Sequence, residues 1–194
     1  MLSLSLLVFL AAALLFFWAV GAHNRLVRLH AAVGKAFAAL DQLLVRQLVW
    51  VQSCLPESMR GGPQTTPGEL QDEVMASWAR LSAASEQFAL ALAQARTQPV
   101  DGAAMDSLVL AQDALDTAWQ SAMRDAVPPD THPSAERLQA KWMQLLHQTL
   151  PLNTAFNEAV EIYNAAIAQF PAWLLAKMFG FRMAGSLNRW SKDR

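Results

Sequence analysis

The sequence predicts an all-α protein. An N-terminal transmembrane helix is expected to continue into an antiparallel up-down four-helix bundle, followed by a short amphipathic C-terminal tail. Three observations favour this fold class: the first 22 residues carry no charge, apolar residues then recur in steps of three and four, and no useful stretch alternates as a strand would. The predicted domains are an anchor at 1–22, a helical bundle at 23–170 and a basic membrane-proximal tail at 171–194.

Composition narrows the class of protein. Of the 194 residues, 54% are hydrophobic and only 16% are charged, against about 25% charged in ordinary soluble domains. We therefore expect part of the chain to lie outside water. The net charge of −1 gives no overall basic field, so nucleic acid is not an expected partner. Cys54 is the single cysteine, which excludes an internal disulfide framework and a cysteine-built zinc site.

The N-terminal run is long enough to cross a membrane, which takes about 20 apolar residues. A cleaved signal peptide is the alternative, but it would need a basic start and a shorter apolar region. Nothing basic precedes the run, whereas Arg25, Arg28 and Lys35 follow it. The positive-inside rule then places the N-terminus outside and the domain in the cytoplasm, at the inner membrane of the cell.

Apolar periodicity predicts four helices, at about 1–55, 66–98, 102–127 and 134–170. Thr66, Pro67 and Glu69 are typical of a helix start, Ser134 can cap the last helix, and Pro151 should kink it. The expected inward faces are Leu26, His30, Val33, Phe37, Leu40, Leu44, Leu48 and Val51; Leu70, Val74, Trp78, Leu81, Ser85, Phe88, Leu92 and Ala95; Leu108, Ala111, Leu115, Trp119 and Ala122; and Leu138, Trp142, Leu145, Thr149, Phe156, Val160, Tyr163 and Ile167.

Similar helix lengths and short loops favour the up-down bundle. A three-helix bundle with one peripheral helix is the alternative. In the up-down arrangement Trp78, Trp119 and Trp142 should form an aromatic layer near the end away from the membrane, flanked by Trp50.

Motifs near the two ends of the chain resemble those of the LemA family. The opening motif comprises Asn24, Leu26, Val27, Asp41 and Arg46, and the closing motif comprises Asn157, Val160, Tyr163, Asn164, Phe170, Pro171, Gly180 and Phe181. His23 and Phe156 stand where the family usually has tyrosine, so the chain resembles a divergent member. The resemblance implies a helical bundle on a single membrane anchor and supplies no mechanism.

The sequence offers no set of residues with a catalytic pattern. His23 and His30 are seven residues apart, too distant for one metal, and no Glu-x-x-His motif of a di-iron bundle occurs. We therefore expect no catalytic, metal or cofactor site.

The C-terminal tail combines aromatic and basic residues. Residues 23–46 have a net charge of +3, residues 47–170 of −8 and residues 171–194 of +4. Such a tail suits the membrane interface, and folding back on the bundle is the alternative. The expected interface residues are Trp18, Arg25, Arg28, Trp173, Lys177, Phe179, Arg182, Arg189 and Trp190.

The expected bundle brings the ends of the sequence together. Asn24 and Asn164 should both lie at its membrane-proximal end, where Asn157 and Asn164 can bond across helices or to lipid headgroups. These features favour a membrane-anchored scaffold or adaptor that contacts the bilayer and either a protein partner or a second copy of itself. The alternatives are an auxiliary subunit of a membrane enzyme, such as a protease, and a transmembrane signalling component.

Overall fold

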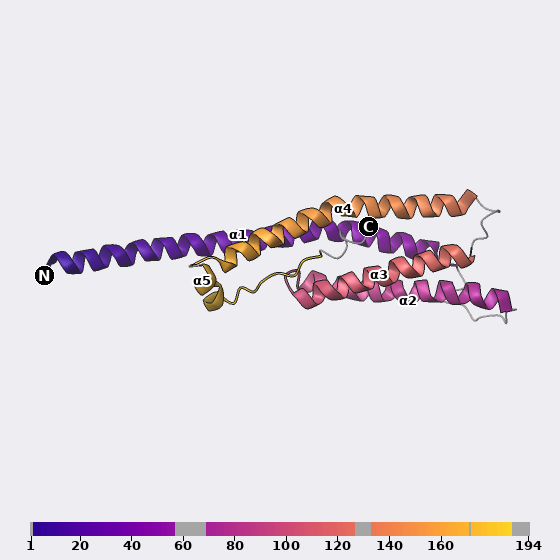
Figure 1. The fold of residues 1–194 in the computed structure, drawn as a ribbon, viewed down its shortest axis with the longest axis horizontal. Coiled ribbons are helices and arrows are strands. Elements are labelled where there is room, and N and C mark those ends of the chain that lie inside the picture. The colour runs from indigo at the N-terminus through magenta and orange to yellow at the C-terminus, as the bar shows by residue number, and fades with distance from the viewer. Residues whose placement is uncertain (1, 57–68, 127–132, 171, 188–194) are drawn as a thin grey trace.

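The computed structural model describes residues 2–56, 69–126, 133–170 and 172–187. It contains α1 (Leu2–Cys54), α2 (Glu69–Thr97), α3 (Gly102–Ala126), α4 (Pro133–Ala168) and α5 (Ala172–Phe179) (Figure 1). The all-helical prediction is confirmed, and none of the described residues forms a strand. The predicted cap residue Ser134 instead lies inside α4, because this helix begins one residue earlier at Pro133, a residue type suited to a first helical position.

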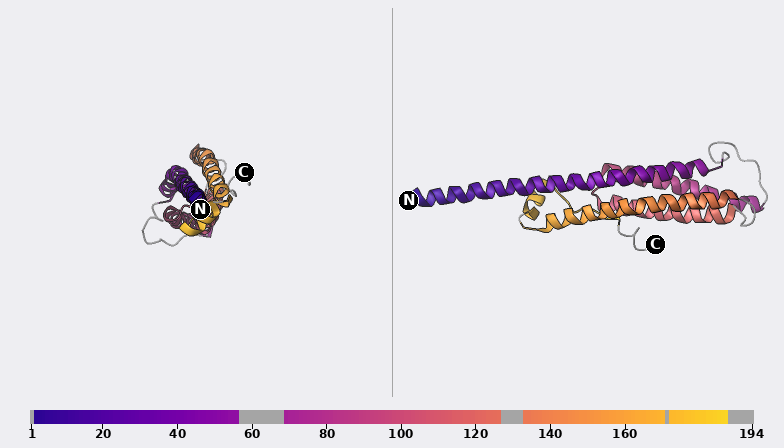
Figure 2. Two further views of the ribbon diagram at one scale, coloured as in Figure 1. Left: turned by 90° about the vertical axis from the view of Figure 1, so that its left-hand side faces the viewer. Right: turned by 90° about the horizontal axis from the view of Figure 1, so that it is seen from above.

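The first helix is the longest, with 53 residues. Its N-terminal part projects beyond the other helices, whereas its C-terminal part lies among them (Figures 1 and 2). Along the projecting part, large apolar side chains such as Phe9 and Leu14 are more than 70% exposed. Within the described residues, α1 is the one helix long and apolar enough to cross a membrane.

The second and third helices form a hairpin around a short turn. Asp101 caps α3, since its Oδ2 accepts a hydrogen bond from the Ala104 amide at 3.0 Å. Near the other end of the hairpin, the Ser77 hydroxyl donates to Asp125 Oδ2 at 2.6 Å. The hairpin is joined to α1 by Arg96, whose Nε donates to Asp41 Oδ1 at 2.7 Å.

The fourth helix runs antiparallel to α1. Phe37 meets Phe156 with ring centroids 5.8 Å apart, and Trp50 meets Trp142 at 6.3 Å, so the numbering rises along α1 as it falls along α4. Figure 1 shows a bend midway along α4. The proline inside this helix is Pro151, which removes one backbone donor.

The core lies between the faces that periodicity predicted. The buried predicted residues are Leu26, Val33, Phe37, Leu40, Leu44 and Val51; Leu81, Ser85, Phe88, Leu92 and Ala95; Leu108, Ala111, Leu115, Trp119 and Ala122; and Trp142, Leu145, Thr149, Phe156, Val160, Tyr163 and Ile167. Of the other predicted residues, His30, Leu48, Val74, Trp78 and Leu138 are half-buried, and the side chain of Leu70 lies outside the described part.

The aromatic layer has a different membership from the predicted one. Trp119 stacks on Trp142 with centroids 5.1 Å apart, and Trp50 lies 4.9 Å from Trp119. Trp50 is therefore a full member of a three-ring cluster. The prediction for Trp78 was wrong: it is half-buried against the core, and the ring contacts found in the described chain do not join it to the other three.

Candidate functional site at the junction of the chain ends

Two asparagines of α4 hold the segment that follows α5. Asn164 Nδ2 donates to the Ala184 carbonyl at 2.9 Å, and Asn164 Oδ1 accepts from the Ala184 amide at 2.8 Å. Asn157 lies about two helical turns earlier on the same side of α4, and its Oδ1 accepts a hydrogen bond from the Leu187 amide at 2.7 Å. An amide side chain can donate and accept at once, so Asn164 satisfies both backbone groups of one residue in an irregular segment.

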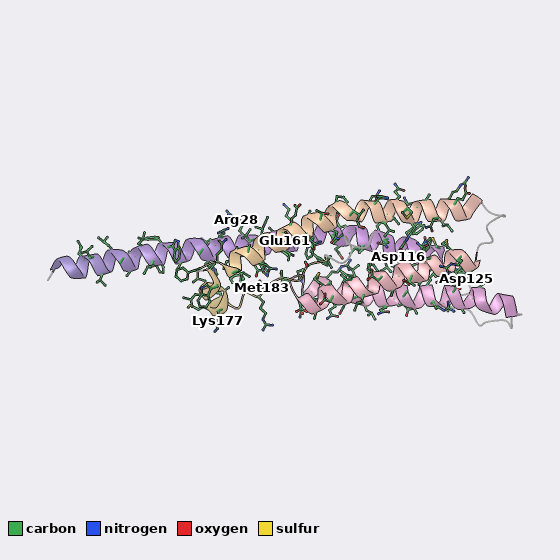
Figure 3. All side chains as sticks on the ribbon, viewed as in Figure 1. Arg28, Asp116, Asp125, Glu161, Lys177 and Met183 are labelled. Atoms are coloured by element: carbon green, nitrogen blue, oxygen red, sulfur yellow. The ribbon has the colours of Figure 1, made fainter. Side chains whose placement is uncertain are left out.

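The same segment also reaches the α2–α3 turn. The Gly185 amide donates to the Val100 carbonyl at 3.2 Å. A Cβ added at Gly185 would lie 2.5 Å from the Cα of Gly102, so backbone approaches backbone here and a larger residue does not fit. Residues 180–187 therefore connect α4 to the hairpin, with Ala184 and Leu187 buried and Met183 exposed (Figure 3).

Glycine ends α5 and turns the chain back toward the domain. Gly180 has φ of +75°, and the Phe181 amide donates to the Ala176 carbonyl at 2.9 Å. These are the features of a Schellman helix end. The Gly-Phe pair of the closing motif therefore has a local structural role, which is to end α5 and reverse the chain.

Aromatic rings join α1 to this turn. His23 lies 4.5 Å from Phe179 and 5.9 Å from Phe181, measured between ring centroids. His30 contacts Phe181 at 6.1 Å and Tyr163 at 5.7 Å. Tyr163 is fully buried, and burial raises the pKa of its phenol. His23 and His30 are therefore packing residues here, and both contact Phe181.

The structure brings together part of the closing motif and part of the opening motif. Leu26, Val160 and Tyr163 are in the core, and Phe181 is half-buried over them. Asn24, Val27 and Arg46 are exposed on α1, Asp41 pairs with Arg96, and Phe170 is exposed against Trp18 at a centroid distance of 6.0 Å. Pro171 lies outside the described residues.

The predicted interface residues lie on α1 and around α5. Trp18, Arg25 and Arg28 are exposed on α1, and Trp173, Lys177, Phe179 and Arg182 are exposed on or just after α5. Figure 3 shows Arg28 and Lys177 on opposite sides of the molecule. Arg189 and Trp190 lie outside the described residues.

A groove of about 460 Å³ opens where α1, the end of α4 and the start of α5 meet. Its lining includes the aromatic side chains of Phe17, Trp18 and Phe170 and the polar side chains of Arg25 and Gln169. No three His, Cys, Asp or Glu side chains within the described ranges are grouped so that they could hold a metal ion. The junction can therefore bind through aromatic, aliphatic and guanidinium groups.

Sequence reasoning missed Val100, Gly102 and Gly185, which meet at the hairpin turn. No periodic pattern covers these residues. Two glycines far apart in the sequence are a weak signal of close backbone approach, because glycines are also common in turns.

Comparison of the chain with protein-family models, with curated proteins and with solved structures finds no match.

Proposed function

We propose that the chain is a single-span membrane protein and a divergent relative of the LemA family, in which α1–α4 act as an antiparallel up-down bundle on the cytoplasmic side. In this proposal the bundle is a scaffold or adaptor. It works through protein–protein and membrane-surface contacts and not through catalysis.

The continuity of α1 is the observation that carries the proposal. One uninterrupted helix has exposed apolar side chains from Leu6 to Val20 and buried core side chains from Leu26 to Val51. Each exposed large apolar side chain would gain about 1.5–3 kcal/mol by leaving water. A bilayer around residues 3–22 removes that exposure and leaves the packed half of the helix in the domain.

Two exposed apolar surfaces support contact-based function. Near the anchor, Trp173, Leu174, Met178 and Phe179 of α5 are 45–71% exposed. On the hairpin, Leu90 and Leu110 are 73% and 56% exposed beside a shallow groove of about 280 Å³ between α2 and α3. We assign the first surface to the membrane and the second to a protein partner or a second copy of the chain.

The anchor and its orientation are tested together in intact cells. We expect the chain to remain in membranes after alkaline carbonate extraction and its intact mass to include all 194 residues. Protease added outside should leave the domain whole and should digest it only after lysis, because the basic residues after the span favour the cytoplasmic side. A mass that lacks residues 1 to about 22 would identify a cleaved signal peptide. Digestion by protease added outside would show the opposite orientation in the membrane.

The scaffold role is tested by photo-crosslinking in intact membranes. A crosslinking residue placed at Leu90 or at Leu110 should capture the same species, because both side chains border one groove. Glu158, exposed on α4 and absent from the lining of this groove, is the control position and should capture much less. Equal capture from Glu158 and Leu90 would argue against a specific contact surface on the hairpin.

A further inference from the structure

We propose that the groove between α1, the end of α4 and the start of α5 binds one phospholipid. The lipid phosphate binds the guanidinium of Arg25, and the parts of the acyl chains nearest the headgroup pack along Phe17, Trp18 and Phe170. This inference rests on the proposed membrane anchoring of α1. It adds a defined lipid site to a helix that would otherwise only be surrounded by bilayer.

The polarity of the groove changes along its length in the way a phospholipid requires. Phe17 and Trp18 belong to the apolar run of α1, whereas Arg25 is its first charged residue. Phe17 and Arg25 are separated by about 12 Å along the helix axis, at about 1.5 Å per residue. Phe170 contacts Trp18 at a centroid distance of 6.0 Å and so adds a second aromatic ring to the apolar part of the lining, and Gln169 adds an amide.

The charge around the groove suits an anion. No acidic residue occurs in residues 1–40 or 162–187, whereas Arg25, Arg28, Lys177 and Arg182 all lie in these stretches. In the described part of the chain, the salt bridge found is that between Arg96 and Asp41, so no carboxylate within those residues pairs with Arg25. A guanidinium binds a phosphate in a bidentate manner.

The position of the groove selects a lipid over a free phosphate. The anchor ends at about Ala22, so the groove spans the expected headgroup level. Its apolar wall is continuous with the exposed apolar surface of α1 and would serve no purpose for an inorganic anion. A lipid can move sideways from the bilayer into this groove while its phosphate stays at the headgroup level.

Gly21 leaves the groove open. This residue lines the groove, and a Cβ added there would meet no atom within 4 Å. A larger side chain at this position would therefore occupy the space of the lipid without clashing at its Cβ. Gly34, on the same helix but outside the groove, also has open space at its Cβ and provides a matched control.

The test uses the full chain, purified in detergent with dioleoylphosphatidylglycerol and analysed by native mass spectrometry. The wild-type chain should retain one phosphatidylglycerol. Gly21→Leu should reduce retention on the order of tenfold by filling the site, whereas Gly34→Leu should match the wild type. Arg25→Gln should weaken binding by about tenfold through loss of the charged hydrogen bonds, and Arg28→Gln should have a smaller effect.

The outcomes separate this inference from the proposed function. Equal retention by Gly21→Leu and the wild type, with both proteins resistant to carbonate extraction, would remove the lipid site and leave the anchor standing. Equal losses in Gly21→Leu and Gly34→Leu would also remove it, since the effect would then belong to the helix. A wild-type chain recovered as a soluble protein without lipid would overturn both proposals. Because Arg25→Gln keeps a good helix-forming residue, it tests the site independently of any folding defect in Gly21→Leu.

Discussion

Replacing Trp119 by alanine should lower the free energy of unfolding by about 3–5 kcal/mol, the range for a fully buried large aromatic residue. Trp119 is completely buried, stacks on Trp142 and touches Trp50. Its Nε1 also donates to Gln139 Oε1 at 3.3 Å. The loss can be measured by chemical unfolding of the full chain in detergent micelles, followed by far-ultraviolet circular dichroism.

Trp78→Ala is the matched control for this prediction. Trp78 has the same side chain on a predicted inward face, but it is half-buried and stands outside the three-ring cluster. Its replacement should cost less than half as much as that of Trp119. Equal losses for the two variants would contradict the packing of α1, α3 and α4 around the cluster.

The helices and most of the core could be predicted because a 3.6-residue period is a strong local signal. All predicted inward residues of the third helix, from Leu108 to Ala122, are buried. Several boundaries were also close, since Gly102 begins α3 and Pro133 begins α4, whereas the predicted start residues Thr66 and Pro67 lie outside the described part of the chain.

The choice of Trp50 over Trp78 could not be predicted from periodicity. The apolar stripe of a core-facing helix is more than about 100° wide, so periodicity does not decide whether a residue near its edge, such as Trp50 on α1 or Trp78 on α2, reaches the centre of the core. Which ring reaches the centre depends on how neighbouring helices cross, and that follows from three-dimensional packing. The spacing along α1 predicted Val51 on the inward face and Trp50 beside the aromatic layer; the structure buries Val51 fully, and Trp50 reaches the cluster from a half-buried position.

Buried glutamines escape a hydrophobic pattern altogether. Gln47 is completely buried and Gln112 is 3% exposed. Within the described part of the chain, neither amide atom of Gln47 has a hydrogen-bond partner. Buried polar groups of this kind are costly for stability and can restrict which helix register is allowed, as polar core positions do in coiled coils.

The candidate site was predictable only in part. The up-down arrangement and the motif asparagines indicated that the two ends of the chain meet, and Asn157 and Asn164 were expected to make amide hydrogen bonds. Their actual partners are backbone groups of residues 184–187, an irregular segment without periodicity. A sequence pattern cannot predict where such a segment lies, because its position is fixed by individual hydrogen bonds and by one close contact between glycines.

Replacing Asn164 by alanine should release residues 181–187 from α4. Both hydrogen bonds to Ala184 would be lost, and each part-buried backbone group left without a partner costs about 1–3 kcal/mol. Two such groups would together cost about 2–6 kcal/mol, and we expect the free energy of unfolding to fall by about 2–4 kcal/mol because the released segment regains contact with water. Hydrogen–deuterium exchange of peptides covering 181–187 should rise while exchange in α2 and α3 changes little.

Asn24→Ala is the matched control, because this asparagine of the opening motif is exposed on α1. A surface substitution of this kind should change stability by no more than about 0.5 kcal/mol. If the two variants lost equal stability, or if residues 181–187 kept their protection in Asn164→Ala, the asparagines would not be what holds the segment.

A double variant tests whether Asn157 and Asn164 act on one segment as a unit. Both bond the backbone between Ala184 and Leu187, and Gly185 in between bonds Val100 of the hairpin turn. Once Asn164→Ala has released the segment, Leu187 can no longer reach Asn157, so adding Asn157→Ala should cost less than it does alone. The expected coupling is about 0.5–3 kcal/mol, as for residues that share partners.

Strictly additive losses would mean that each asparagine stabilises α4 by itself. Coupled losses would explain why two amides seven residues apart belong to the closing motif, since together they tie α4 to the α2–α3 hairpin through eight residues of irregular chain.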